Sequence, residues 1–292
     1  MLDRNPMHGP TVSKKDTEQP YPGTDAAMHR KADHGEESYD GCGKLAGLAA
    51  IITGGDSGIG RAVAIAFAKE GADVAIGYLS EQEDVDAQET RRHVEAAGRR
   101  CLVHRFDVRS QQACREFVDM AANEFGRLDV LVNNAAYQME QKGIEDLTEE
   151  QIDRTFRTNI YGYIFMAQAA MKHLKAGGCI INTGSVTAME GNPGLIDYSS
   201  TKGAIHTFTR TLAESIADKG IRVNCVAPGP VWTPLIPATM SPENVATFGE
   251  DTFWKRPAQP IEIATSYVYL ASADARYITG EVIAITGQSG TR

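Results

Sequence analysis

The sequence has no long uninterrupted run of apolar residues, and this absence excludes a transmembrane helix. A helix that crosses a bilayer needs roughly 18 or more apolar residues in succession, and no stretch of the 292 residues approaches that length. The first residues, Met-Leu-Asp-Arg-Asn-Pro, also lack the apolar segment of a secretory signal peptide. We therefore expect a cytoplasmic protein that does not bind membranes.

Positive charge and cysteine are scarce as well. The chain has 29 Lys and Arg residues against 38 Asp and Glu residues, a formal net charge of −9, so its average surface would repel nucleic acid and we expect no such partner. The five cysteines are scattered and form no C-x-x-C pair, which predicts no metal site and no redox motif. We expect free thiols in a reducing compartment.

The composition of the chain changes near Lys44. Residues 1–44 mix prolines with charged residues, histidines and glycines and show no apolar period, so this segment cannot build a core of its own. Over residues 45–292, apolar strand-like runs alternate with amphipathic helical stretches, the pattern of a parallel sheet covered on both faces. We predict an irregular, extended N-terminal arm over residues 1–44 and a single α/β domain over residues 45–292.

Seven strand-like runs define the predicted sheet. Gly71 and Gly98 are suited to end the first two helices, and Ser110 and Thr148 to cap the next two. Strands joined by right-handed helical crossovers form one doubly wound, Rossmann-type sheet whose ligands bind outside the carboxyl ends of the strands. The predicted strands cover residues 48–53, 72–78, 101–106, 129–132, 179–183, 222–227 and 282–285.

A glycine-rich turn follows the first predicted strand. Gly54, Gly58 and Gly60 have the spacing G-x-x-x-G-x-G rather than the more common G-x-G-x-x-G. Backbone N–H groups and the positive end of the helix dipole face an anion such as a pyrophosphate at such a turn. Glycine permits a positive φ there, and its missing Cβ lets a phosphate approach. The turn predicts a dinucleotide site, although a glycine-rich loop without a ligand would have the same spacing.

Tyr198 and Lys202 lie four residues apart in a predicted helix, so their side chains project from the same face. The unperturbed pKa of a phenol is about 10, and an adjacent ammonium lowers that pKa enough for proton exchange with an alcohol or carbonyl. Ser185, just after the fifth predicted strand, could hydrogen-bond the same substrate oxygen. Taken alone, a Tyr/Lys pair at this spacing is usually an ordinary surface pair.

Further motifs fall at the predicted strand ends in a fixed order: Asp107-Val108, Asn133-Asn134-Ala135, Asn159 and Pro228-Gly229. With the glycine-rich turn, Ser185 and the Tyr198/Lys202 pair, they make the chain from about Lys44 to Gly290 resemble the short-chain dehydrogenases/reductases. Residues 53–60, 83–88 and 227–233 resemble the branch with an N-terminal arm, which includes plant glucose and ribitol dehydrogenase homologues and bacterial general-stress oxidoreductases.

The resemblance implies an NAD(P)-dependent alcohol dehydrogenase or carbonyl reductase, which transfers a hydride between the nicotinamide and its substrate. It implies that Tyr198 is the general acid/base and that Ser185 polarises the substrate oxygen. Lys202 would both perturb Tyr198 and hold the nicotinamide ribose. Asn159 resembles a residue that interrupts its helix and holds a water in a proton relay towards Lys202, and the alternative is a solvated polar side chain.

The same resemblance implies which residues contact the dinucleotide. Asp107 and Val108 resemble the pair that contacts the adenine, and Thr233 resembles a residue that bonds the nicotinamide carboxamide. Ala136 stands where glycine is usual, and its methyl group could tighten the cleft. The expected contacts are Gly54, Asp56, Ser57, Gly58, Ile59, Gly60, Tyr78, Asp107, Val108, Asn134, Ala135, Ala136, Thr183, Tyr198, Lys202, Pro228, Gly229, Val231 and Thr233.

The choice between NAD and NADP depends on the end of the second predicted strand. NAD-binding proteins of this architecture place an acidic residue there for the adenosine ribose, whereas NADP-binding proteins place a basic residue nearby. Here Tyr78 occupies that place, Glu81, Glu83 and Asp84 follow, and Arg61 is the obvious nearby cation. Because the carboxylates would repel an additional phosphate, we favour NAD and leave NADP open.

The substrate is less determined by the sequence. The resemblance suggests sugars, polyols or small reactive aldehydes. A non-catalytic dinucleotide-binding protein and a sugar-nucleotide epimerase or dehydratase are the alternatives, and enoyl reductases on this fold space the Tyr and Lys further apart. The proline-rich loop over residues 230–257 is a predicted lid, and the expected lining of the mouth is Val186, Thr187, Met189, Leu195 and Trp232.

Two helices, one after the fourth strand and one with Tyr198, carry more apolar residues than packing against a sheet requires. Relatives pair these helices across a two-fold axis, and a second axis at the last strand predicts a homotetramer. Tyr21, Met28, Tyr39 and Leu45 are spaced as anchors for an arm laid over an existing surface. We expect this arm to supply no catalytic groups, and a solubilising tail is the alternative.

Overall fold

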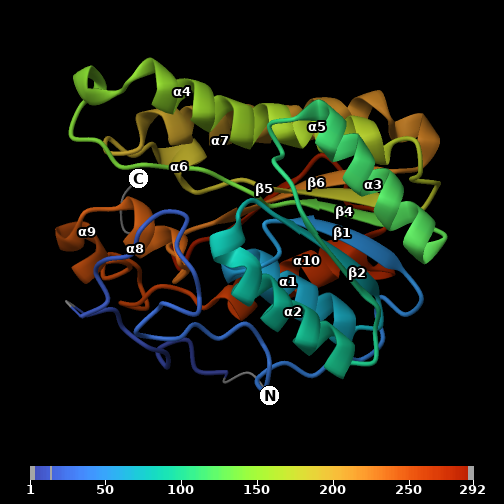
Figure 1. The fold of residues 1–292 in the computed structure, drawn as a ribbon, viewed down its shortest axis with the longest axis horizontal. Coiled ribbons are helices and arrows are strands. Elements are labelled where there is room, and N and C mark those ends of the chain that lie inside the picture. The colour runs from blue at the N-terminus through green and yellow to red at the C-terminus, as the bar shows by residue number, and fades with distance from the viewer. Residues whose placement is uncertain (1–3, 14, 289–292) are drawn as a thin grey trace.

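Seven parallel strands form the sheet at the centre of the computed structural model, which describes residues 4–13 and 15–288 (Figure 1). The strand order is β3-β2-β1-β4-β5-β6-β7, so the sheet is doubly wound from β1. Each predicted strand is present within one residue of its expected bounds. The strands are β1 Ala49–Thr53, β2 Asp73–Tyr78, β3 Cys101–Arg105, β4 Val130–Asn133, β5 Cys179–Thr183, β6 Arg222–Pro228 and β7 Val282–Ile285.

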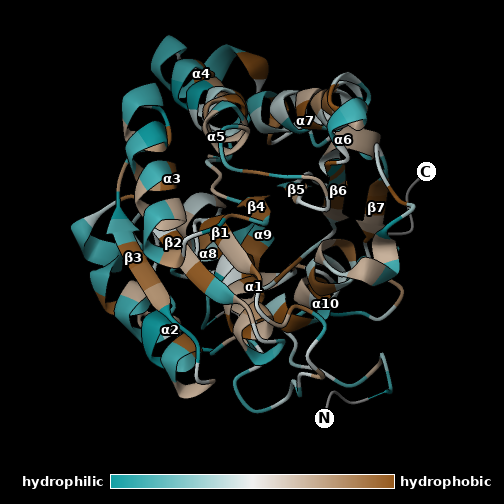
Figure 2. Ribbon diagram, turned by 90° about the vertical axis from the view of Figure 1, so that its right-hand side faces the viewer, coloured by the Kyte–Doolittle hydropathy of each residue, from teal (hydrophilic) through white to brown (hydrophobic). Residues whose placement is uncertain are grey.

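Helices cover both faces of the sheet, which explains the continuous apolar runs of its central strands. Every residue of β1 and β5 is buried. Figure 2 shows the hydrophobic residues on the strands and the hydrophilic residues on the outer sides of helices such as α2 and α3. One face is covered by α1 Gly58–Lys69, α2 Asp84–Ala96 and α10 Pro260–Ala271, the other by α3 Gln111–Phe125, α5 Gly162–Ala170 and α7 Ile196–Ser215 (Figure 1).

The expected helix caps are present. The Ser110 hydroxyl accepts a hydrogen bond from the Ala113 N–H (3.3 Å), and the Thr148 hydroxyl accepts one from the Gln151 N–H (3.2 Å). These bonds satisfy backbone donors that have no partner within the first turn of a helix. Gly71 ends the first helix with a φ of 97°, a conformation that favours glycine.

The long helix predicted after Thr148 is interrupted. It consists of α4 Glu149–Phe156, a π-helical turn over Arg157–Tyr161, and α5. Asn159 lies in the π-helical turn, as the resemblance implied for a residue that interrupts its helix. Such turns break the regular i to i−4 hydrogen bonding and are frequent at functional sites.

Three short helices were not predicted, because four or five residues are too few to show an apolar period. They are α6 Thr187–Glu190, α8 Leu235–Thr239 and α9 Pro242–Ala246. The segment with α8 and α9 lies beside the N-terminal arm, which is blue in Figure 1. Within the part of the chain described, no helix is long and apolar enough to cross a membrane, and no group of three His, Cys, Asp or Glu side chains is placed to hold a metal ion.

The arm is packed against the rest of the chain. Met28 is buried in a cluster with Trp232, Ile236 and Val245. Further along, Leu45 is fully buried in the main core, and the Tyr39 hydroxyl donates a hydrogen bond to Glu70. These contacts agree with the anchors expected from the sequence.

Candidate active site

The glycine-rich turn between β1 and α1 requires its glycines. Gly54 and Gly58 have φ values of 63° and 50°, which L side chains rarely adopt. A Cβ atom at Gly60 would lie 1.8 Å from the carbonyl oxygen of Gly54, so the helix can start this close to the turn only with glycine there. The backbone can follow this path only with glycine, as expected for the turn of a pyrophosphate site.

The end of β4 supports this turn. The Asn134 backbone N–H donates to the Thr53 hydroxyl (3.0 Å), and its side-chain amide donates to the carbonyl oxygens of Thr53 and Gly54 (both 3.1 Å). Asn133 is fully buried and donates to the Asn182 side chain (2.9 Å) on β5. The asparagine pair therefore fixes the glycine-rich turn relative to the centre of the sheet.

A cleft runs along the carboxyl ends of the central strands, where a doubly wound sheet binds its ligands. We call it the dinucleotide cleft. Gly60 does not line the cleft and instead lies against Gly54 and Asn134, which do, and the neighbouring pocket is lined by Pro228, Gly229 and Val231. The expected contacts that line the cleft are Gly54, Asp56, Ser57, Gly58, Ile59, Tyr78, Asp107, Val108, Asn134, Ala135, Ala136, Thr183, Tyr198, Lys202 and Thr233.

Several residues that line the cleft were missed by the sequence reasoning. Tyr21 and Pro22 come from the arm, and Arg154 comes from α4. Tyr21 had been singled out only as an anchor, and Arg154 carries no sequence signal because it belongs to the polar side of its helix. Glu83 also lines the cleft and belongs to the acidic run noted after the second strand.

The candidate catalytic residues meet at the start of α7. Lys202 is buried, and its Nζ lies 5.3 Å from the centre of the Tyr198 ring and donates a hydrogen bond to the Thr183 carbonyl oxygen (2.8 Å). Ser185 follows β5 and is close enough to Tyr198 for its hydrogen bond to lower the phenol pKa. The structure therefore brings Tyr198, Lys202 and Ser185 together as expected.

The expected direction of the Tyr198 pKa is wrong for this structure. Burial raises the pKa of Tyr198 to about 12, and the hydrogen bond of Ser185 lowers it only in part. Burial also lowers the pKa of Lys202 to about 8. Lys202 is fully buried and Tyr198 is half-buried, and the loss of hydration outweighs the lowering of the Tyr198 pKa that the adjacent ammonium suggested.

Asn159 is fully buried and connects the loop after β4 to α7. Its side-chain oxygen accepts from the Tyr137 N–H (2.8 Å), and its amide donates to the Tyr137 carbonyl oxygen (2.9 Å) and to the Thr201 hydroxyl (3.0 Å). Thr201 immediately precedes Lys202. Asn159 is thus not a solvated surface side chain, and its contacts hold the cleft wall against the catalytic helix.

A second pocket adjoins the dinucleotide cleft, and the two share five lining residues, Tyr198 among them. Val186, Thr187 and Leu195 line this substrate pocket as expected. Met189 and Trp232 do not line the pocket. Met189 is 51% exposed, whereas Trp232 is 1% exposed and donates its indole N–H to the Arg30 carbonyl oxygen (3.0 Å) of the arm. The arm covers Trp232, which the sequence did not reveal.

Acidic residues line parts of both cavities. The described lining of the substrate pocket contains no Lys, Arg or His, but it includes Glu140, Glu190 and Asp251. At the adenosine end of the cleft, Asp56 is buried, and one oxygen of its carboxylate has no hydrogen-bond partner among the described residues. Burial and the nearby Glu83 carboxylate raise the pKa of Asp56 to about 8. An unpartnered carboxylate oxygen in a cleft fits a ligand hydroxyl that donates to it.

Two of the cations near this end are paired with carboxylates. Arg61 lies 3.2 Å from Asp86, and Arg109 lies 2.6 Å from Asp107. The Arg109 guanidinium holds the pKa of the Asp107 carboxyl below its usual range. Arg154 lines the cleft as well and lies over the Tyr137 ring, so this end presents carboxyl groups together with one cation that stacks on aromatic rings.

The fold, the glycine-rich turn and the two adjoining cavities define a nucleotide-dependent oxidoreductase. A family model described as enoyl-(acyl carrier protein) reductase matches residues 54–287. The chain belongs to the short-chain dehydrogenase/reductase family, whose members are NAD(P)-dependent oxidoreductases.

The relatives include bacterial and plant proteins. General stress protein 39 of Bacillus subtilis is 50% identical over 93% of this chain and 94% of its own length. NADPH-dependent aldehyde reductase 1, chloroplastic, of Arabidopsis thaliana is 47% identical over 93% of this chain and 96% of its own. Glucose and ribitol dehydrogenase of Daucus carota is 47% identical over 90% and 91%, respectively. These names agree with the branch that the sequence resembled.

A solved structure has the same fold. A short-chain dehydrogenase from Burkholderia cenocepacia, in complex with NADP, is 33% identical with a TM-score of 0.79. The match covers 85% of this chain and 100% of that chain.

Proposed function

We propose that the protein is an alcohol dehydrogenase or carbonyl reductase in which Tyr198 is the general acid/base. The observation that carries this proposal is that Tyr198 lines both the dinucleotide cleft and the substrate pocket. A bound nicotinamide supplies the acceptor or donor of the hydride. In oxidation, the carbinol carbon loses that hydride and its hydroxyl loses a proton to Tyr198. In reduction, Tyr198 donates the proton to the carbonyl oxygen.

The neighbouring residues have supporting roles in this proposal. Ser185 orients and polarises the substrate oxygen, since it follows β5 beside Tyr198 and lines the substrate pocket. Lys202 lines the cleft and holds the hydroxyls of the nicotinamide ribose. Asn159 fixes the position of α7, and its place in the π-helical turn suits a water held by its backbone towards Lys202.

The expected substrates are neutral sugars, polyols or small aldehydes. Carboxylates and amide groups such as Glu140, Gln138 and Asn244 line the substrate pocket, and carboxylates accept hydrogen bonds from hydroxyl groups. The same carboxylates would repel sugar phosphates and carboxylic acids. The names of the plant relatives, an aldehyde reductase and a glucose and ribitol dehydrogenase, support this class.

A substrate panel tests the proposal. Neutral sugars, polyols and aldehydes should change the nicotinamide absorbance, whereas sugar phosphates and an enoyl thioester should not. Turnover of the enoyl thioester alone would favour the reaction in the family description over ours. Dinucleotide binding without any turnover would favour the non-catalytic alternative.

The two directions of the reaction should differ in their pH dependence. Because burial raises the pKa of Tyr198 to about 12, the phenol is protonated at neutral pH and can donate for carbonyl reduction. We expect kcat for reduction to stay level from about pH 6 to about pH 8, and kcat for oxidation to rise with pH as the phenolate fraction increases. Initial rates at saturating dinucleotide measure both profiles, and an oxidation rate that falls over this range would contradict the assignment.

We also propose a preference for NAD, based on the carboxylates at the adenosine end. Asp56 and Glu83 line that end of the cleft. Asp56, whose pKa is raised to about 8, is largely protonated at neutral pH; it has an oxygen that can accept from a ribose hydroxyl and offers no counter-charge to the additional phosphate of NADP. The NADP complex of the Burkholderia protein and the NADPH in the name of the Arabidopsis relative point the other way, so the two dinucleotides should be compared directly.

The comparison uses kcat/KM with each dinucleotide. The wild type should favour NAD, and Tyr78→Arg should shift the preference towards NADP by placing a cation at the end of β2. Val85→Arg is a control, because Val85 is 68% exposed and does not line the cleft, so this substitution adds the same charge outside the lining. A wild-type preference for NADP of about tenfold or more would contradict the proposal.

We also propose that the protein assembles as a homotetramer. Ile152, Phe156 and Tyr161, on α4 and the π-helical turn, are 40%, 37% and 45% exposed, and such apolar groups are common at subunit interfaces. Light scattering of the purified protein measures the mass, and a monomeric mass would contradict the assembly.

A further inference from the structure

The N-terminal arm crosses the margin of the dinucleotide cleft. Tyr21 and Pro22 line this cleft, although they precede β1 by more than twenty residues. On one side, the Gln19 N–H donates to the Pro237 carbonyl oxygen (3.2 Å) on α8. A Cβ atom at Gly23 would lie 2.6 Å from the Pro234 carbonyl oxygen, which shows how closely the arm follows the segment after β6.

The Tyr21 ring packs against the loop after β4 and against α4. Tyr21 packs edge to face against Tyr137, with ring centres 5.3 Å apart. The guanidinium carbon of Arg154 lies 4.6 Å from the centre of the Tyr21 ring and 4.3 Å from that of Tyr137. Such cation–π and aromatic contacts fix the orientation of a ring. Tyr21 therefore connects the segment after β6 with α4 and the loop after β4.

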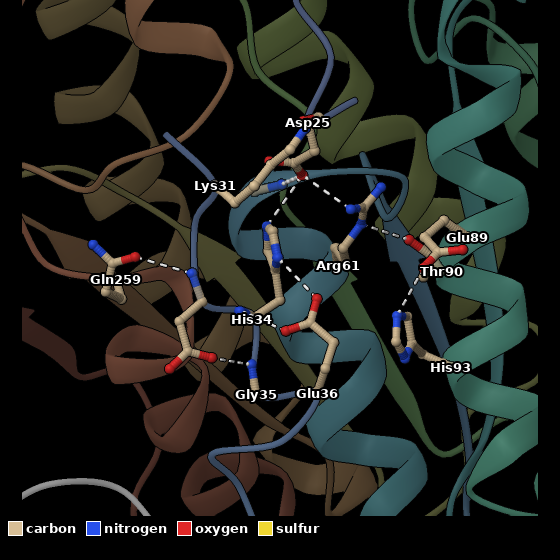
Figure 3. A network of polar contacts seen from close by, with 12 residues as sticks. Asp25, Lys31, His34, Gly35, Glu36, Arg61, Glu89, Thr90, His93 and Gln259 are labelled. Atoms are coloured by element: carbon tan, nitrogen blue, oxygen red, sulfur yellow. Dashed lines mark hydrogen bonds and ion pairs between the residues drawn. The ribbon is translucent and has the colours of Figure 1, made fainter. Parts of the chain in front are cut away.

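The arm is also anchored to the glycine-rich turn itself, as the network in Figure 3 shows in part. The Asp25 carboxylate accepts a hydrogen bond from the Gly58 N–H (3.0 Å) and lies 3.1 Å from His34 and 3.5 Å from Arg61. Asp86 on α2 accepts from the Asp25 N–H (2.5 Å). These charged groups are buried, and a buried charge is costly to leave without its partner. The arm next to Tyr21 is thus held firmly in place.

The anchored arm places Tyr21 beside the elements that follow β2 and β3. The backbone N–H groups of Asp25 and Ala26 donate to Asp86 on α2 (2.5 and 3.0 Å), and Tyr21 lines the cleft together with Tyr78 of β2 and Asp107 after β3. Burial raises the pKa of Tyr21, and the nearby Arg154 and Glu83 act on it in opposite directions. Because the ends of β2 and β3 form the adenosine side of a doubly wound dinucleotide site, Tyr21 lies at the adenosine half.

We propose that Tyr21 is a cofactor-binding residue whose ring forms a wall over the adenosine half of the dinucleotide. This inference rests on the dinucleotide site of the proposed function. A ring in this place contacts the base or ribose and excludes water from it. Tyr137 and Arg154 position the ring, and the anchored arm holds it there. The arm then contributes to the site rather than only to stability.

The test compares dinucleotide binding by the full-length wild type, Tyr21→Ala and Tyr21→Phe. Loss of the ring should raise the Kd for NADH about tenfold, in line with base–aromatic stacking, and should speed NADH dissociation in stopped-flow fluorescence. Tyr21→Phe keeps the ring and should stay within about threefold of the wild type. ADP-ribose should lose affinity in Tyr21→Ala by the same factor as NADH, because it contains the adenosine half.

A second variant distinguishes the contact between Tyr21 and the dinucleotide from the docking of the arm on the rest of the chain. Met28→Ala weakens the packing of the same arm against Trp232 and Ile236 but changes no residue that lines the cleft. It should lower the melting temperature and leave the Kd for NADH within about threefold of the wild type. Equal Kd values for the wild type and Tyr21→Ala, or an equal loss in Met28→Ala, would overturn the proposal. Because binding is measured directly, the comparison decides the role of Tyr21 even where no substrate is turned over.

Discussion

Replacing Tyr198 with phenylalanine should lower kcat by about 10²- to 10⁴-fold, the usual contribution of general acid/base catalysis. The variant removes one hydroxyl and keeps the ring that lines the cleft and the pocket. The Kd for the dinucleotide should therefore stay close to the wild-type value. Steady-state kinetics and calorimetry measure the two quantities. Retention of half the wild-type activity would contradict the assignment of Tyr198.

A matched control is the loss of a neighbouring phenol that lies outside both cavities. The Tyr163 hydroxyl donates to the Thr183 carbonyl oxygen (3.2 Å), and its ring lies 5.6 Å from the Lys202 Nζ. Tyr163→Phe therefore makes the same chemical change beside the site but removes no residue of the cleft lining. Most of the activity should remain, so a similar loss in both variants would mean that a general disturbance of the site is responsible.

Replacing Lys202 with methionine should lower both turnover and dinucleotide affinity, because we propose that its ammonium acts in catalysis and also binds the nicotinamide ribose. A hydrogen bond to a charged group contributes about 1.5 to 3 kcal/mol, which corresponds to a rise in Kd of about tenfold or more. Burial lowers the pKa of Lys202 to about 8, so the side chain is a cation below this pH and neutral above it. Wild-type affinity should fall as the pH rises through about 8, whereas the Kd of the variant should not follow this change.

Thermal melting distinguishes a loss of dinucleotide affinity in Lys202→Met from damage to the fold. The unfolded chain binds the Lys202 proton up to its ordinary pKa, whereas the folded chain releases it above about 8. Between these values stability rises with pH, and at neutral pH the buried charge opposes folding. Lys202→Met should therefore keep or raise the melting temperature at pH 7. An unchanged Kd of Lys202→Met for the dinucleotide, measured by calorimetry, would contradict the proposed role of Lys202 in dinucleotide binding.

Most of the sheet and the central part of the site follow from local sequence signals. Strands buried on both faces are continuous apolar runs, and Gly54, Gly58 and Gly60 are required by backbone geometry that few other residues permit. The order of polar residues after successive strands then places them at one edge of the sheet, because parallel strands end there together.

The remaining features depend on contacts between distant segments. Trp232 was expected at the mouth of the substrate pocket, but the arm covers it and accepts its indole N–H. The phenol of Tyr198 was expected to be more acidic than usual, and its burial makes it less so. Tyr21 and Arg154 meet only after the arm has docked. None of these relations has a spacing or period that a sequence could reveal.

The hydrogen bond from Gly58 to Asp25 means that the arm and the glycine-rich turn do not loosen independently. Local opening of the arm would leave the Gly58 amide without its acceptor and leave Arg61 with only one of its two carboxylate partners. The two segments therefore form one cooperative unit in local unfolding. By thermodynamic reciprocity, any ligand that binds the ordered turn more tightly than the open one also holds the arm closed. A chain loaded with its dinucleotide would then present these first residues to a protease less often than an empty one.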